Sequence, residues 1–322
     1  MRYQVLIVLV TLVSFAAVST ATAVCIGIFW PRLEASFARI PAGGRARRLV
    51  ALRLVPIVLA LLACGVTMLA FLRHEPADTR ETPGLFVVVG AAIGAGLLVT
   101  GLWRLTTRCR ATNRFLRIVE RTATRVTALG VPVPIWQVDT AFPLVALAGI
   151  WRPSLLIARS VLEQIPRDEL QVILEHELAH ARRHDNAVRL LLSGLPDVLN
   201  LVRPGIERAW HETAEEVADQ MAAGDDARLR VHLASALVRV AKMAGTQAAP
   251  ALPVLAFHNG ESVERRVRRL LNRPEPRATV SSLPIAVMAA VLLSAGVGLW
   301  LGADTVLLEA HRAIEWMVNA RL

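Results

Sequence analysis

Cysteine and lysine are scarce in this chain. The 322 residues include three cysteines, Cys25, Cys64 and Cys109. Two of them lie within long apolar stretches, so the sequence implies neither a disulfide framework nor a cysteine metal cluster. Lys242 is the single lysine, and arginine therefore supplies almost all of the basic charge. The sequence also lacks an internal repeat and any low-complexity tract beyond a general richness in alanine.

Charged side chains are almost absent from four long stretches, and this excludes an ordinary soluble protein. The chain is 54% hydrophobic, with a mean hydropathy of +0.48. Each stretch is long enough to span a bilayer, so we predict four transmembrane helices, at residues 3–30, 49–72, 85–103 and 283–301. Arg53 interrupts the second stretch near its start, where its side chain is expected to snorkel to the headgroups. Gly90 and Gly94 form a G-x-x-x-G pattern in the third, which indicates close helix packing.

The arginines between these stretches predict how the chain crosses the membrane. Residues 31–48 hold five arginines against Glu34, and residues 104–117 hold five arginines and no acid. Residues 73–83 and the tail 302–322 each hold two arginines against three acids. Because arginine near the end of a span stays in the cytoplasm, we predict a multi-pass protein of the cell membrane. Both termini are expected outside, and the first stretch is expected to be a retained span rather than a secretory signal.

The formal net charge of +10 is a second consequence of the many arginines. Much of this excess lies beside the apolar stretches, where anionic lipid headgroups are the natural partner. We therefore expect the lipid bilayer to be a partner of this protein, and we expect no direct binding of nucleic acid.

The segment His176-Glu177-Leu178-Ala179-His180 is an H-E-x-x-H motif. Residues four apart share one face of a helix, so His176 and His180 can reach a single metal ion. Glu177 then projects beside that ion, where its carboxylate can take a proton from a metal-bound water. The flanking residues predict a helix over 166–184, with acids in its first turn and an apolar stripe. The alternative interpretation is two histidines on an ordinary helix.

A catalytic zinc needs a third protein ligand and an open position for water. Downstream, Glu215 and Asp219 are four residues apart on a second predicted helix and share a face. We predict Glu215 as the third ligand, and Asp219 as the partner that orients one of the two ligand histidines. Glu212 and Glu216 are the alternative ligands on the same helix. His184 lies about 80° around the helix from His176, too far for a shared metal, and is expected at the surface.

Residues 105–282, between the third and fourth stretches, are long enough for one compact cytoplasmic domain. Short apolar runs separated by turn residues predict a small sheet, with strands at 134–138, 144–148 and 154–158. Helical periodicity predicts helices at 108–129, 166–184, 227–243 and 261–272, besides the Glu215 helix, which is expected to follow a break at Pro204-Gly205. Residues 187–202 are unusually apolar and are expected to pack on the membrane face or on the spans. The predicted fold class is mainly α, with four transmembrane helices and a cytoplasmic α+β domain inserted between the third and fourth.

These motifs together resemble those of one family. The H-E-x-x-H motif continues as Arg183 and Asp185, which is similar to the H-E-x-x-H-x-x-R-x-D signature of the BlaR/MecR-type membrane metallopeptidases. The Glu215 motif resembles the third-ligand motif that the HtpX-type membrane proteases share. Gly149–Pro153 resembles the edge-strand region of the BlaR/MecR-type family, and Glu264–Val267 resembles the basic segment that precedes the last span in that family. The resemblance implies a zincin (gluzincin) domain, and since only residues 302–322 follow the last stretch, no penicillin-binding sensor domain is expected.

The resemblance implies a zinc metalloendopeptidase with Glu177 as the general base. Arg183 and Asp185 are interpreted as a structural pair, and His211 is the nearest candidate for stabilising the transition state. A peptide substrate is expected to add to the edge strand near 145–149. Three functions stay open: regulatory cleavage of a target such as a cytoplasmic repressor, quality control of the HtpX kind, and a non-enzymatic zinc-bearing scaffold, against which an intact Glu177 argues.

Overall fold

The structure is a computed structural model that describes residues 3–74, 82–127, 130–197, 203–245 and 260–272. It also describes three short helical pieces near the C-terminus, at residues 308–309, 311–312 and 315–316. The predicted fourth span, at 283–301, lies outside the described residues.

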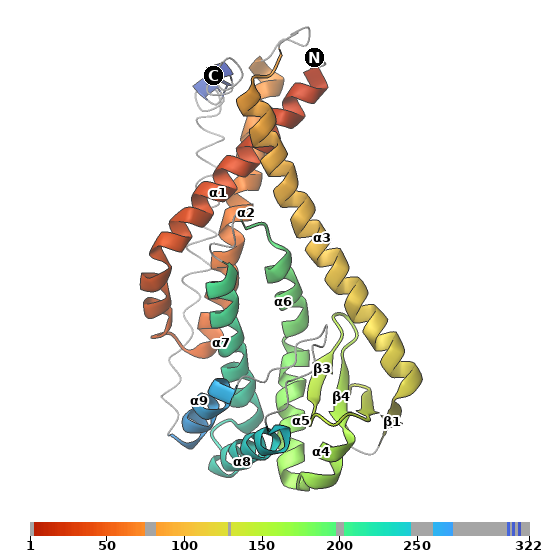
Figure 1. Cartoon of the computed structure of the whole chain (residues 1–322). Coiled ribbons are helices and arrows are strands. Elements are labelled where there is room, and N and C mark those ends of the chain that lie inside the picture. The colour runs from red at the N-terminus through yellow and green to blue at the C-terminus, as the bar shows by residue number, and fades with distance from the viewer. Residues whose placement is uncertain are drawn as a thin grey trace.

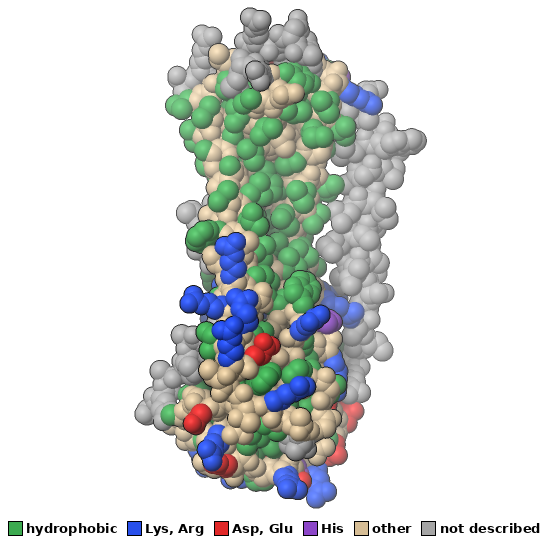
Figure 2. Space-filling view, turned by 90° about the vertical axis from the view of Figure 1, so that its right-hand side faces the viewer, with side chains coloured by type: hydrophobic (Ala, Val, Ile, Leu, Met, Phe, Trp, Pro, Cys, Tyr) green, Lys and Arg blue, Asp and Glu red, His purple; other side chains and the backbone are tan. Residues whose placement is uncertain are grey.

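Three long helices form one end of the molecule (Figure 1). They are α1 (Tyr3–Phe37), α2 (Ala42–His74) and α3 (Leu85–Thr122), and each is long and apolar enough to cross a membrane. Each of the first three predicted stretches lies inside one of these helices, which supports a membrane protein. In Figure 2, hydrophobic side chains cover the part of this face formed by the long helices, and arginines gather below them, over the lower part of the molecule.

Gly90 and Gly94 let α1 and α3 approach closely, as the G-x-x-x-G pattern indicates. A Cβ atom added at Gly94 would lie 2.3 Å from the backbone oxygen of Leu12, and one added at Gly90 would lie 3.1 Å from Val13. The backbones of the two helices therefore meet at a point where a side chain has no room.

The prediction that Arg53 snorkels to the headgroups is wrong. Its side chain is buried, with 1% of the residue exposed. The guanidinium donates hydrogen bonds to the carbonyl oxygens of Leu195 (2.9 Å) and Pro196 (3.2 Å) and lies 3.8 Å from Asp197. These groups follow the C-terminus of α6 (Asp185–Gly194), where the helix dipole favours a cation. Arg53 thus connects a membrane helix to the domain below it.

A four-stranded sheet lies beside the lower half of α3. Its strands are β1 (Thr124–Val126), β2 (Ile135–Val138), β3 (Val145–Ala148) and β4 (Ser154–Ala158), in the order β1-β2-β4-β3. β2 and β4 are parallel, and the outer strands pair antiparallel with them. The three predicted strands are present, and β3 is an edge strand.

The prediction of a separate helix over 108–129 is wrong. α3 continues without a break from the third apolar stretch to Thr122, and the next residues form β1. A three-residue strand with two β-branched residues is too short to show periodicity of its own, and its pairing with β2 determines it.

Six further helices complete the described part of the chain. α4 (Arg159–Gln164) and α6 (Asp185–Gly194) were not predicted as helices. α7 begins at Arg203, so Pro204-Gly205 opens that helix instead of preceding it. Their bounds are α4 Arg159–Gln164, α5 Arg167–Arg182, α6 Asp185–Gly194, α7 Arg203–Ala223, α8 Ala227–Ala244 and α9 Gly260–Leu271.

Two apolar clusters position the helices that carry the predicted site. One lies between the sheet, α5 and α8, and includes Leu156, Ile173 and Val240. The other holds α6 and α7 against α1 and α2, through residues such as Leu49 and Trp210. α5 is therefore fixed on the sheet and α7 on the membrane helices, and the two helices pack against each other.

Gly94→Ala should lower the free energy of unfolding by about 1–3 kcal/mol, because overpacking at a closed contact strains both helices. The matched control is Gly96→Ala, since a Cβ atom added there meets nothing within 4 Å. That variant should be unchanged or more stable by up to about 1 kcal/mol, because alanine favours the helix. Thermal unfolding of the full chain in detergent compares the two. Equal stability of both variants would contradict the close approach of α1 and α3.

Candidate metal centre

α5 carries both histidines of the H-E-x-x-H motif on its inner face. The helix begins after Pro166. Asp168 and Glu169 lie in its first turn, where their negative charge interacts favourably with the positive end of the helix dipole. His176 and His180 are buried, at 5% and 6% exposed. Because they are four residues apart, their rings project from the same face, and their Nε2 atoms lie 3.3 Å from each other.

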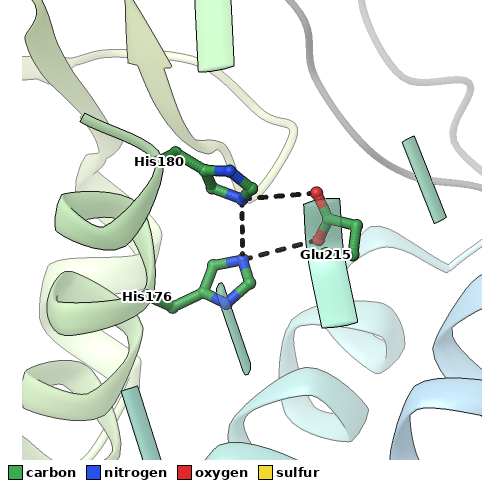
Figure 3. Close-up of side chains that lie close together, drawn as sticks. All are labelled: His176, His180 and Glu215. Carbon is green, nitrogen blue, oxygen red and sulfur yellow. Dashed lines mark hydrogen bonds and ion pairs between the residues drawn. The ribbon is translucent and has the colours of Figure 1, made fainter. Parts of the chain in front are cut away.

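α7 brings Glu215 opposite these two rings (Figure 3). Glu215 Oε2 lies 3.4 Å from His176 Nε2, and Oε1 lies 3.4 Å from His180 Nε2. A tetrahedral metal with bonds of about 2.0–2.1 Å has its ligand atoms about 3.3–3.4 Å apart. The separation of the two imidazole nitrogens, and that of each nitrogen from one oxygen of Glu215, are close to this value. The two imidazoles and the one carboxylate therefore fit a bound metal ion.

A tight turn after α5 supplies a contact that the sequence analysis missed. Arg183 and Asp185 form the expected pair, with Arg183 Nε 3.3 Å from Asp185 Oδ1. His184 between them is exposed and has a positive φ of 55°, which reverses the chain and starts α6. Asp185 Oδ2 then lies 2.8 Å from His180 Nδ1. This contact directs the other ring nitrogen of His180 toward Glu215.

Asp219 lies beside His176, where the four-residue spacing from Glu215 predicts it. Asp219 Oδ1 is 3.0 Å from His176 Nδ1. Each histidine therefore has a carboxylate at Nδ1 and presents Nε2 to the centre. Arg266 on α9 also contacts this group, since its Nη1 lies 2.7 Å from Glu215 Oε2 and its Nη2 lies 2.6 Å from Asp219 Oδ1. The sequence analysis did not assign Arg266 to the site.

The two alternative ligands on α7 face other partners. Glu212 is exposed and pairs with Arg265 at 3.2 Å. Glu216 contacts Arg45 of α2 and lies 3.2 Å from Arg269 of α9. Of the three glutamates on this part of α7, only Glu215 faces the histidines.

Glu177 lines a pocket of about 80 Å³ next to the two histidines and Glu215. Its Oε2 accepts a hydrogen bond of 3.1 Å from the backbone N–H of Leu147 on the edge strand β3. Asn186 of α6 donates to the carbonyl oxygens of Leu147 (3.1 Å) and Gly149 (2.8 Å). Both backbone groups of Leu147 are thus already bonded. An extended peptide that adds to β3 needs either the free positions around Val145 or the displacement of these side chains.

Apolar side chains form much of the rest of the pocket wall, mainly from β3 and α8, and include Leu147, Leu233, Leu237 and Val240. The charged residues Asp185, Arg189 and Arg266 also line it. His211, the predicted transition-state stabiliser, is half-buried one turn before Glu215 and is not among the described residues that line this pocket. Burial, with nearby Arg189, lowers the pKa of His211 to about 3. Its imidazole is therefore neutral, and that role stays a prediction.

Burial and charge act in opposite directions on the ionisable groups of the centre. Burial disfavours the charged carboxylate of Glu215, but Arg266 and the two histidines hold its pKa well below the usual range. Burial raises the pKa of Glu177, against the two histidines that favour its charged form. For His180, burial opposes protonation, but the hydrogen bond to Asp185 and the nearby carboxylate of Glu215 raise its pKa to about 10. Glu215 is therefore a ready anionic ligand, while Glu177 is shifted toward a proton-accepting base.

Residues 82–270 match the protein family described as BlaR1 peptidase M56. This match covers more than half of the chain and includes both histidines, Glu177, Glu215 and Asp219. A search of curated proteins found no match.

In the metal-free protein, His180 should keep its proton up to a pH of about 10. Its pKa is raised from the ordinary 6.5, so the stability that protonation contributes is fully present below pH 6.5 and is lost as the pH rises toward 10. Imidazole NMR and thermal unfolding across this range measure the effect. Asp185→Asn should lower the pKa of His180 and flatten the pH dependence of stability. A His180 resonance that titrates near 6.5 in the unaltered chain would contradict this electrostatic arrangement.

Proposed function

The chain belongs to the BlaR1 peptidase M56 family, and we propose that it is an integral-membrane zinc endopeptidase that cleaves a cytoplasmic or membrane protein. The family is one of membrane metallopeptidases, and the three apolar helices agree with that membership. The proposal adds the metal, the residues that hold it and the location of the substrate.

One observation carries the proposal. His176 Nε2, His180 Nε2 and the carboxylate of Glu215 converge at separations of 3.3–3.4 Å, beside a pocket into which Glu177 opens. Two histidines and one glutamate are a donor set that catalytic zinc takes in peptidases. These three residues are the proposed zinc ligands, and they leave the pocket side of the centre for water and substrate.

The residues around the pocket can carry out peptide hydrolysis. Zinc bound by the three ligands would supply an activated water, with its pKa lowered to about 7, and a Lewis acid for the scissile carbonyl. The Glu177 carboxylate would accept a proton from the attacking water and pass it to the leaving amine. Glu177 Oε2 also accepts the hydrogen bond from the Leu147 N–H group, so this contact holds the carboxylate at the edge of the sheet.

Regulatory cleavage is the function we favour, with a transcriptional repressor as the type of target. The support for it is family membership together with the arginine-rich flanks of the spans, which favour a cytoplasmic site. Quality control of membrane proteins, of the HtpX kind, uses the same chemistry and is the alternative. A zinc-bearing scaffold without activity is disfavoured because Glu177 lines the pocket. A site that only binds zinc requires no base at this position.

Glu177→Gln should retain zinc and lose about 10²–10⁴-fold of the cleavage rate, because it removes the proton acceptor but no ligand. His180→Ala and Glu215→Ala should lose the metal as well. Zinc content of the purified full chain and the set of cellular proteins cleaved by wild type and by Glu177→Gln are the measurements. A neighbouring repressor that accumulates only with Glu177→Gln would identify the regulatory target.

Glu212→Ala is the matched control for Glu215→Ala, since Glu212 lies on the same helix but pairs with the exposed Arg265. It should keep both zinc and activity. Equal loss of zinc in Glu177→Gln, His180→Ala and Glu215→Ala would eliminate the distinction between base and ligand. Zinc bound by the wild type without any cleavage would favour the scaffold.

The arginine-rich segments 31–48 and 104–117 should place the metal centre in the cytoplasm, and the C-terminus should lie outside. Alkaline phosphatase, which is active only outside, should be active when fused after Leu322, and green fluorescent protein should not fluoresce there. Fusions after Ala244 should show the opposite pattern. Fluorescence after Leu322 would overturn this topology and with it the cytoplasmic substrate.

A further inference from the structure

Arg266 occupies an inward position on α9. Val263, Arg266, Val267 and Leu270 recur at the i, i+3, i+4 and i+7 positions that form the buried face of a helix. The apolar side chains Val267 and Leu270 pack on α7 and α8. Arg266 lies among them, and only 8% of the residue is exposed. Because arginine is almost never buried without a partner, its guanidinium is expected to be paired.

The guanidinium of Arg266 uses all three of its nitrogens on two carboxylates. Nε and Nη2 donate to Asp219 Oδ2 (3.0 Å) and Oδ1 (2.6 Å), and Nη1 lies 2.7 Å from Glu215 Oε2. Such a fork-shaped, charge-assisted contact fixes direction as well as distance. Asp219 is thereby held at His176 Nδ1, and Glu215 is held by one of its two oxygens.

The other oxygen of Glu215 remains directed into the centre. Oε1 is buried, has no hydrogen-bond partner among the described residues, and lies 3.4 Å from His180 Nε2. A buried carboxylate oxygen without a partner is costly, and a cation between Oε1 and the imidazoles would satisfy it.

We propose that Arg266 is a positioning residue of the metal centre, which binds Glu215 Oε2 so that Oε1 is presented to the metal and which fixes Asp219 against His176. This inference rests on the metal centre of the proposed function. It adds Arg266 of α9, a residue that lies 47 positions after Asp219 in the sequence.

Neighbouring arginines of α9 also form ion pairs with α7 and so help to align the two helices around Arg266. Arg265 pairs with Glu212 and Arg269 pairs with Glu216, so three arginines of α9 contact α7 on either side of Glu215. The outer two pairs are partly exposed and contribute little individually. Of these three arginines, Arg266 is the one that reaches the centre.

Zinc affinity of the full chain, measured by competition with a chromophoric chelator, tests the proposal directly. Arg266→Lys keeps the charge but loses the fork, and it should raise the zinc Kd about 10–100-fold, as the loss of a partner that orients a ligand does. The absorption spectrum of the cobalt-substituted protein should change as well, because Glu215 is no longer fixed. Arg268→Met is the control, since Arg268 is exposed and pairs only with Glu264 of its own helix among the described residues. It should leave both measurements unchanged.

A double variant separates positioning from simple charge balance. Arg266→Met leaves two buried carboxylates without their cation and can fail to fold, whereas Arg266→Met combined with Asp219→Asn removes one of these charges as well. If Arg266 positions Glu215, the folded double variant should still bind zinc weakly. Restored affinity in the double variant, or unchanged or tighter zinc binding by Arg266→Lys, would overturn the proposal. A wild-type chain that binds no zinc would instead refute the proposed function itself.

Discussion

The need to pair buried charge is the constraint on which the rest of this structure depends. Asp185, Glu215 and Asp219 are all buried carboxylates, and an unpaired buried charge is strongly destabilising. Their partners come from two other helices: two histidines of α5 and one arginine of α9. Satisfying these charges therefore requires α5, α7 and α9 to meet at one point, and that meeting point is the candidate metal centre.

The sequence predicts well what helical spacing alone determines. His176 with His180, and Glu215 with Asp219, are pairs four residues apart, so each pair shares a helix face whatever the surroundings. Spacing cannot show which distant side chain faces a given carboxylate. Asp185 was therefore assigned only to Arg183, although it also contacts His180. Arg266 could have been found, because it replaces an apolar residue in the inward stripe of α9, but its partners depend on tertiary packing.

The junction between membrane helices and domain was the least predictable part of the fold. A charged side chain near the end of an apolar stretch can either reach water or bind a protein partner. Arg53 binds a protein partner, because it donates hydrogen bonds to the carbonyl oxygens that follow α6. Arg45 of α2 likewise reaches Thr213 and Glu216 on α7. Both contacts join residues more than 140 positions apart. No local pattern reports them, yet they attach the C-terminal end of α6 and the helix that carries Glu215, α7, to α2.

The backbone N–H group of Leu147, on the edge strand β3, donates a hydrogen bond to the Glu177 carboxylate. A strand that adds to β3 at this position and the resting carboxylate compete for the same donor, and a single N–H cannot serve both at full strength. An incoming strand that bonds to this N–H group has to displace the Glu177 carboxylate, which already lines the pocket. Occupation of this edge of β3 and the position of the Glu177 side chain are therefore coupled.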